Sequence, residues 1–303
     1  MNSEQFKGLI KHQDTPHGVS KEQRSVFDKL RENTESPPIC KTKFLKLMGK
    51  IGWPSTMTRP DISMEFSTLS SCVQDPRVVH YDAGLVVVGY LVATKRFGIT
   101  YGGKLRVPYG MSEMPPHFEI SGGLYTAHDS SWGSRPRPLG GYVVMYNNGA
   151  IDWAARQIKI VPDSTCQAET AVGSIATKAT CFVRAFLFFH KRAVTGPTAM
   201  LGDNKAMVEH VQQDGASSKT RHYERATLLI KRAVLMLLLK PYLVSTHLMI
   251  ADIFTKAVEK EAFVRYRNVM MNCHVSLREI LRDSVNTVHG EARLLVTRLL
   301  GRV

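Results

Sequence analysis

The sequence predicts an α/β fold with a mixed five-stranded sheet, preceded by a helical region. Residues 44–101 repeat apolar side chains at spacings of three and four, which is typical of amphipathic helices. From residue 124 onward, short strand-like segments are followed by long helical ones, as in α/β proteins. Glycine and proline are concentrated between residues 102 and 116, so we expect a domain boundary there.

The region before this boundary is expected to be helical. Residues 1–43 form a polar N-terminal extension with one short helix around Lys21 to Arg31. Residues 44–103 follow as a helical region, and residues 104–117 as a linker. A segment this rich in glycine and proline forms turns and loops and contributes little to a packed core.

The sheet begins with three antiparallel strands after the linker. We expect strands at Leu124 to His128, Gly141 to Tyr146 and Ala150 to Ile160. Asn148-Gly149 favours a tight hairpin turn between the last two, because both residue types tolerate positive φ.

The rest of the sheet domain, which spans 118–258, alternates helices and strands. Apolar residues at helical spacing predict a long amphipathic helix over Ser164 to Phe189. The later elements are a strand at Thr198 to Leu201, a helix from Asn204, a helix over about His222 to Leu239, a strand at Tyr242 to Thr246 and a helix at Met249 to Val258. Residues 259–303 are expected to form an amphipathic helical tail.

Composition limits the classes of function. Hydrophobic residues make up 44% and charged residues 22% of the 303 residues, which excludes wholesale disorder. A net charge of +14 favours a polyanionic partner, either nucleic acid or an acidic membrane surface. We expect no membrane partner, because no apolar run reaches the roughly 18 to 20 residues of a membrane span. The N-terminus lacks a secretory pattern, so the protein is expected inside the cell, with cytoplasm or nucleus left open.

Four acidic residues lie where predicted strands end or helices begin: Asp129, Glu169, Asp203 and Asp252. These ends can converge in a compact mixed sheet, and carboxylate oxygens are the ligands that Mg²⁺ prefers. Two such ions can stabilise both the attacking water and the leaving oxygen of a phosphodiester displacement. On spacing alone, a chance distribution of acidic residues stays the stronger alternative.

Several short motifs in register resemble one family. The first group is Thr58-Arg59-Pro60-Asp61-Ile62, Leu69-Ser70, Pro76, His80, Ala83, Tyr90-Leu91, Thr94-Lys95, Gly98 and Tyr101. The second group is His128-Asp129-Ser130-Ser131-Trp132, Gly141-Tyr142-Val143, Trp153 with Gln157, Ser164 to Glu169, Asp203-Asn204 and Ala251 to Lys256. Together they resemble the C-terminal part of the Pol polyprotein of copia-type LTR retrotransposons. The first group is similar to the end of the reverse transcriptase, and the second to the ribonuclease H domain.

The resemblance implies a ribonuclease H-like fold and cleavage of the RNA strand of RNA/DNA hybrids. It assigns Asp129, Glu169, Asp203 and Asp252 as catalytic carboxylates that hold two Mg²⁺ ions, with Mn²⁺ as an alternative metal. The charge pattern agrees with this, because residues 118–258 hold 16 Lys and Arg against 10 Asp and Glu. A basic rim around an acidic site suits a nuclease.

We expect the nucleic acid to contact Asn204, Lys219, Arg221 and His222. Residues 219–222 open a predicted helix and resemble a basic stretch of the family, and helix N-termini favour phosphate. For residues 219–222, a solvated basic turn is an equally good interpretation.

The chain departs from the family pattern at three positions. Ser131 replaces a second Asp, Gln167 replaces a Glu, and Met249 replaces a polar residue. No Tyr-x-Asp-Asp polymerase motif occurs, so the chain is expected to act without polymerase activity. The family resemblance implies the rest of a Pol polyprotein as a partner. Two alternatives stay open: an inactive retroelement fragment that binds nucleic acid or is purely structural, and a domesticated regulator that works through residues 1–43 and 268–303.

Overall fold

The structure is a computed structural model that describes residues 13–18, 20–32, 35–102, 120–132, 138–213 and 223–272. These residues divide into two compact units. The helical unit contains the described residues up to Gly98 together with Ala257–Val264. The sheet unit contains Ile99–Lys256 and Arg265–Asn272, so helix α9 (Lys260–Met271) contributes residues to both.

The helical unit confirms the helices predicted before the boundary. Its elements are α2 (Lys21–Asp28), η2 (Leu30–Glu32), α3 (Lys41–Met57), η3 (Pro60–Ile62), α4 (Ser63–Ser70) and α5 (Val78–Ala93). Helix α2 begins at Ser20, whose hydroxyl accepts from the Gln23 amide while the Gln23 side chain accepts from the Ser20 amide. The core of the helical unit is formed by buried apolar side chains at helical spacing, such as Phe44, Leu47 and Ile51 of α3.

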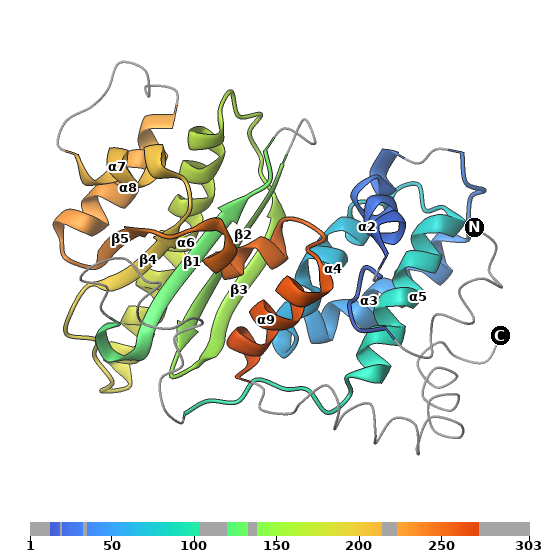
Figure 1. The fold of residues 1–303 in the computed structure, drawn as a ribbon, viewed down its shortest axis with the longest axis horizontal. Helices are drawn as coiled ribbons and strands as arrows, with labels where there is room; N and C mark the ends of the chain where they lie inside the picture. The colour runs from blue at the N-terminus through green and yellow to red at the C-terminus, as the bar shows by residue number, and fades with distance from the viewer. Residues whose placement is uncertain are drawn as a thin grey trace. The chain divides into compact units, whose positions relative to one another are not determined.

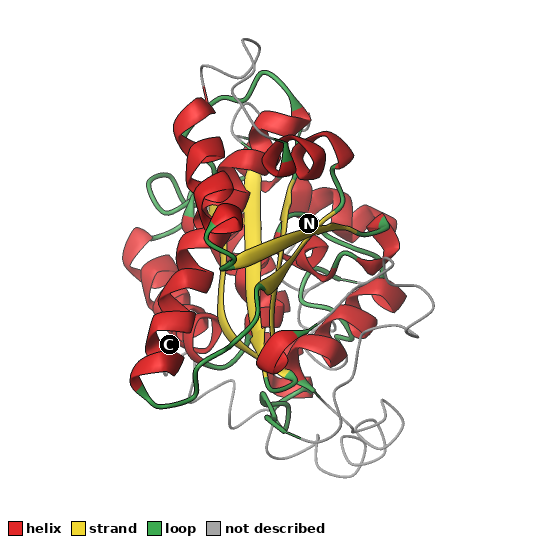
Figure 2. Ribbon diagram, turned by 90° about the vertical axis from the view of Figure 1, so that its left-hand side faces the viewer, coloured by secondary structure: helices red, strands yellow, loops and turns green. Residues whose placement is uncertain are grey.

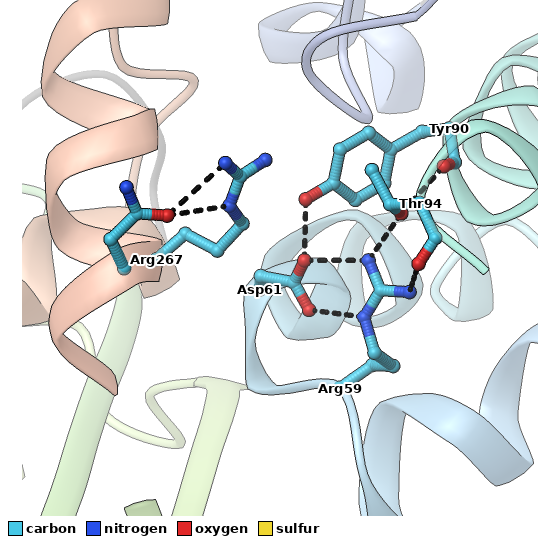
Figure 3. Close-up of polar contacts among 6 residues, drawn as sticks. Arg59, Asp61, Tyr90, Thr94 and Arg267 are labelled. Carbon is cyan, nitrogen blue, oxygen red and sulfur yellow. Dashed lines mark hydrogen bonds and ion pairs between the residues drawn. The ribbon is translucent and has the colours of Figure 1, made fainter. Parts of the chain in front are cut away.

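A buried ion pair joins η3 to α5 inside this unit (Figure 3). Arg59 donates from Nε to Asp61 Oδ1 at 2.9 Å and from Nη2 to Asp61 Oδ2 at 2.8 Å. The Tyr90 hydroxyl donates to the same carboxylate, and Arg59 Nη2 also donates to Thr94 Oγ1 at 2.7 Å. Both charges are therefore paired and hydrogen-bonded, as buried charges require.

The sheet unit contains the predicted mixed five-stranded sheet (Figure 1). Its strands are β1 (Leu124–Ser130), β2 (Leu139–Tyr146), β3 (Gly149–Gln157), β4 (Thr198–Gly202) and β5 (Leu239–Leu243), in the order β3-β2-β1-β4-β5. The first three pair antiparallel, and β4 pairs parallel with both β1 and β5. A short turn, η5 (Ser121–Gly123), precedes β1.

Helices α6 (Thr165–Phe189), α7 (Lys205–Gln212) and α8 (Glu224–Leu235) share an apolar core with one face of the sheet. Figure 2 shows these strands in yellow with helices in red beside them. Two adjacent glycines of β2 mark the two faces: a Cβ added at Gly140 would meet Val172 of α6, and one added at Gly141 would meet Phe254. Because neighbouring strand residues point to opposite faces, α6 and Phe254 lie on opposite sides of the sheet.

The predicted hairpin turn is present, but one residue earlier than expected. Asn147 and Asn148 both have positive φ, of 50° and 70°, and Tyr146 pairs with Gly149. This is the pattern of a two-residue type I′ turn. Gly149 is the first residue of β3 instead of a turn residue, and a Cβ there would lie 2.8 Å from the side chains of Ile99 and Tyr101.

The boundary predicted between the third helix of the sheet domain and the fifth strand was wrong by three to four residues. Helix α8 ends at Leu235, and β5 covers Leu239–Leu243 instead of 242–246. The apolar run 235–239 fits a helix and a strand equally well by pattern. The helix ends because Leu237 adopts a positive φ of 54° and the Leu238 amide donates to the Ala233 carbonyl at 2.9 Å.

The helix predicted at Met249 to Val258 is instead two 3₁₀ turns, η7 (Thr246–Leu248) and η8 (Ile250–Phe254). Asp252 N donates to Met249 O and Thr255 N to Asp252 O, which is the i to i+3 pattern. All of Ile250–Phe254 is buried, so this segment has no solvent-facing side like that of an amphipathic helix. In a 3₁₀ turn, side chains three residues apart lie one above the other.

Of the tail predicted over 259–303, the structure describes α9, which is helical as expected, and residues 273–303 lie outside the described residues. The linker predicted at 104–117 also lies outside them.

Helix α6 is long and apolar enough to cross a membrane by length and composition alone. One side of α6 packs in the core of the sheet unit through Ala176, Val183 and Leu187, and the helix contacts β1, β2 and α8, while 44% of its apolar window is buried. Length and apolarity are therefore weak evidence for a membrane span here.

Candidate metal centre

Asp129 and Asp203 lie side by side because of the parallel register of β1 and β4. Ala127 pairs with Leu201, and each aspartate is two residues further along its strand direction. Side chains two residues apart on a strand share a face, so the two carboxylates leave the sheet at the same edge. This is the convergence of strand ends that the sequence predicts.

Glu169 comes to the same edge from the second turn of α6. Ser164 caps this helix by accepting from the Gln167 amide, and the turn that follows carries Glu169 to the end of β1. Glu169 Oε1 accepts from the Ser130 amide at 2.9 Å and from the Ser130 hydroxyl at 2.7 Å. The carboxylate is thus fixed by the residue directly after Asp129.

Ligand oxygens of Asp129, Glu169 and Asp203 all lie within 4.8 Å of one another. Asp129 and Glu169 are buried, and Asp203 is half-buried. The structure therefore brings three of the four predicted carboxylates into one cluster, which we call the carboxylate cluster.

Asp252, the fourth predicted carboxylate, is buried in η8 and is not a member of this cluster. Its Oδ1 lies 2.9 Å from Lys256 Nζ, four residues later. It is still close enough to Asp129 and Asp203 to be affected by their charges.

The surroundings of Asp129, Asp203 and Asp252 disfavour a negative charge on all three carboxyl groups at once. Burial, and then the charge of Glu169, raise the pKa of Asp129. Burial, and then the charge of Asp129, raise the pKa of Asp203, and the same two causes raise that of Asp252 to about 7. Buried like charges favour protonation unless a cation compensates them, so the site favours the binding of a cation.

One carboxylate oxygen of the cluster has no hydrogen-bond partner among the described residues. Glu169 Oε2 is buried and lies 3.3 Å from His128 Nδ1, without hydrogen-bond geometry. An orphaned acceptor beside two further carboxylates suits a hard divalent ion, whose ligands in proteins are oxygen atoms. On this observation the donor set fits Mg²⁺ or Mn²⁺.

Two polar groups of the site were missed as site residues by the sequence analysis. The Thr255 hydroxyl donates to Asp129 Oδ2, and the Thr246 hydroxyl donates to Asp203 Oδ2 at 3.2 Å. Lys256, which pairs with Asp252, was also missed. The sequence signal for Thr255 and Lys256 is their spacing of three and four residues after Asp252. This spacing indicates a shared site only if the segment is known to form a turn.

Of the four predicted nucleic-acid contacts, the structure describes one, Asn204. Asn204 caps α7, because its Oδ1 accepts from the Met207 amide at 3.0 Å, so its side chain has a structural role next to Asp203. Lys219, Arg221 and His222 lie outside the described residues.

No family model matches the chain. It is 22% identical over 232 residues to the "Retrovirus-related Pol polyprotein from transposon TNT 1-94" of Nicotiana tabacum, an alignment that covers 76% of this chain and 16% of that protein. It is 22% identical over 194 residues to a transposon Ty5-1 protein of Saccharomyces cerevisiae, covering 56% of this chain and 59% of that protein. These similarities support a transposon Pol-like origin.

A third relative has a different name. The "Secreted RxLR effector protein 161" of Plasmopara viticola is 25% identical over 138 residues, which cover 45% of this chain and 87% of that protein. The chain thus spans a small part of the tobacco Pol polyprotein and less than two thirds of the Ty5-1 protein.

Proposed function

We propose that this chain is a ribonuclease H of a copia-type Pol, which uses divalent metal to hydrolyse the RNA strand of RNA/DNA hybrids. The observation that carries the proposal is the carboxylate cluster, in which Asp129 of β1, Glu169 of α6 and Asp203, which follows β4, meet at one edge of a mixed five-stranded sheet. The similarity to transposon Pol proteins and the basic composition support a nucleic-acid substrate.

The carboxylate cluster would hold Mg²⁺ or Mn²⁺, with Asp252 beside it. The metal, when bound, supplies Lewis-acid stabilisation of the phosphate and lowers the pKa of water. The family resemblance implies two ions.

The protein's own groups position the carboxylates. Ser130 fixes the Glu169 carboxylate with two hydrogen bonds, and Thr255 fixes that of Asp129 with one. A site built on strand ends and a packed turn is rigid, and such preorganisation lowers the reorganisation cost of catalysis.

The overall reaction is hydrolysis of a phosphodiester bond. A water oxygen forms the new bond to phosphorus, the bond to the leaving sugar oxygen breaks, and that oxygen takes a proton. The excess of basic residues in 118–258 supplies long-range attraction for the hybrid, with Lys219, Arg221 and His222 as proposed contacts. The rest of a Pol polyprotein is a proposed partner, and the interior of the cell is the proposed location.

The proposal is tested by cleavage of a hybrid whose RNA and DNA strands carry different labels. We expect cuts in the RNA strand that require Mg²⁺ and disappear with a chelator. Asp203→Asn should lower the rate at least about 100-fold, because it removes a charged ligand of the metal that would stabilise the reacting phosphate. Asp75→Asn, an exposed aspartate of the helical unit paired with Arg77, is the matched control and should cleave normally.

Metal-dependent cleavage that survives Asp203→Asn would contradict the proposal, and so would cleavage of the DNA strand alone. Intact hybrid binding without any cleavage would favour the alternative, an inactive retroelement fragment that retains the fold.

A further inference from the structure

Lys256 is a cation supplied to the site by the chain itself. Its Nζ lies 2.9 Å from Asp252 Oδ1, and its side chain is 46% exposed. The Asp252 side chain is only 6% exposed, so the pair joins a buried carboxylate to a partly exposed ammonium group.

Three polar groups lie in η8 and directly after it. The Thr255 and Lys256 amides both donate to the Asp252 carbonyl, and side chains at spacings of three and four lie on one side of such a turn. Thr255 donates to Asp129, so its neighbour Lys256 is held next to the carboxylate cluster. The position of Lys256 is thus set by backbone and hydrogen bonds as well as by charge.

Several carboxylates act on this one ammonium group. Burial alone would lower the pKa of Lys256, but the charges of Asp129, Asp252 and Asp203 outweigh it and raise the pKa. Conversely, the charge of Lys256 lowers the pKa of Asp129, Asp203 and Asp252. Lys256 therefore compensates the same negative charge that a second metal ion would compensate.

We infer that the Lys256 ammonium takes one of the two cation positions of this site, so that the protein binds one divalent ion, at Asp129, Glu169 and Asp203. This inference rests on the proposed function, because it assumes that the carboxylate cluster binds metal. Asp252 is then a ligand of Lys256 and not of a second ion.

Three physical arguments favour this assignment. A tethered ammonium acts at a high effective concentration, whereas a divalent ion must come from solution. A second ion at Asp252 would also have to displace Lys256 and leave that positive charge beside two metal ions. Mg²⁺ in addition loses its hydration water reluctantly, so a site already neutralised by an ammonium group attracts it weakly.

The test counts bound ions without using activity. Mn²⁺ is titrated into the full chain, and free Mn²⁺ is measured by its electron paramagnetic resonance signal. We expect one bound ion for the wild type, two for Lys256→Met, and one for Lys256→Arg, which keeps the positive charge. Lys240→Met is the matched control and should bind one ion. Lys240 pairs with Ala199 near the start of β4, whereas Asp203 follows the other end of that strand.

Each outcome decides between the two proposals. Two ions on the wild type, or one on Lys256→Met, would overturn the role of Lys256 and leave the metal site standing. No bound ion on the wild type would overturn both the inference and the metal-dependent function. If Lys256→Met does not fold, as judged by circular dichroism, Lys256→Gln provides the same count with a polar side chain.

Discussion

Buried aspartates in the two units have opposite surroundings. In the helical unit, Asp61 is 1% exposed and receives two hydrogen bonds from Arg59 and one from Tyr90 (Figure 3). In the sheet unit, Asp129 is 5% exposed and lies beside Glu169 and Asp203, and its described hydrogen bond comes from the neutral Thr255 hydroxyl.

The difference is one of charge balance. The charge of Asp61 is balanced inside the fold, and the same interaction raises the pKa of Arg59 although burial alone would lower it. The charges of the carboxylate cluster are only partly balanced, so the pKa values of Asp129 and Asp203 rise and a site for a cation remains. Burial of an acidic residue is therefore uninformative until its partners are known.

The largest expected effect comes from breaking the balanced pair. Arg59→Met leaves Asp61 buried without its cation, and we expect the free energy of unfolding to fall by about 3–5 kcal/mol. Denaturant unfolding measures this loss. Lys205→Met, in an exposed pair with Glu209 at 3.7 Å, is the control and should change stability by no more than about 0.5 kcal/mol. Equal losses in the two variants would contradict the comparison.

A smaller effect is expected where the sheet supports η8. A Cβ at position 141 would lie 2.1 Å from Phe254 Cβ, so Gly141→Ala forces η8 away from β2. We expect a loss of about 1–3 kcal/mol in unfolding free energy, together with weaker Mn²⁺ binding, because Thr255 moves with the turn.

Gly98→Ala is the control for this prediction, since nothing lies within 4 Å of an added Cβ at Gly98. Undiminished Mn²⁺ binding by a destabilised Gly141→Ala variant would show that η8 does not position the metal ligands.

The smallest expected effect is on the pH dependence of stability without metal. Burial, and then the charge of Asp129, raise the pKa of Asp252 from 3.8 to about 7. The folded state binds this proton more tightly than the unfolded state, so its stabilising contribution is full below pH 3.8 and is lost as pH rises through about 7. Thermal unfolding in chelator should show a larger drop in Tm from pH 5 to pH 8 for the wild type than for Asp252→Asn. An equal drop would mean that Asp252 is charged over this whole range.

The sequence predicts the sheet well because its elements have clear periodic patterns. The β2–β3 hairpin and helix α6 follow from strand alternation and from apolar spacing over 25 residues. The end of α8 could not be predicted, because the leucine run at 235–239 satisfies both patterns and the positive φ of Leu237 has no sequence signal. The turn choice between Asn147-Asn148 and Asn148-Gly149 depends on strand register, which is a tertiary property.

The convergence of three acidic residues could be predicted from the sequence, whereas the groups that contact them could not. Asp129, Glu169 and Asp203 could be placed together because strand ends and helix starts converge at one sheet edge. Thr255 and Lys256 follow the 3₁₀ turn η8 at spacings of three and four after Asp252, which an α-helix would also place on one face. Thr255 reaches Asp129 through the tertiary contact of η8 with β1, which the chain pattern does not show. Irregular segments carry weak periodic signals, so their side-chain directions cannot be obtained by pattern alone.

We propose that the carboxylate cluster is a divalent-metal site. The rise in Tm on adding Mn²⁺ at pH 8 tests this proposal most directly. A ligand that binds only the folded state stabilises it, so the wild type should unfold at a higher temperature with Mn²⁺ than in chelator. Glu169→Gln keeps the shape of the side chain and should lose most of that rise. The same rise in both proteins, or no rise in the wild type, would contradict the account.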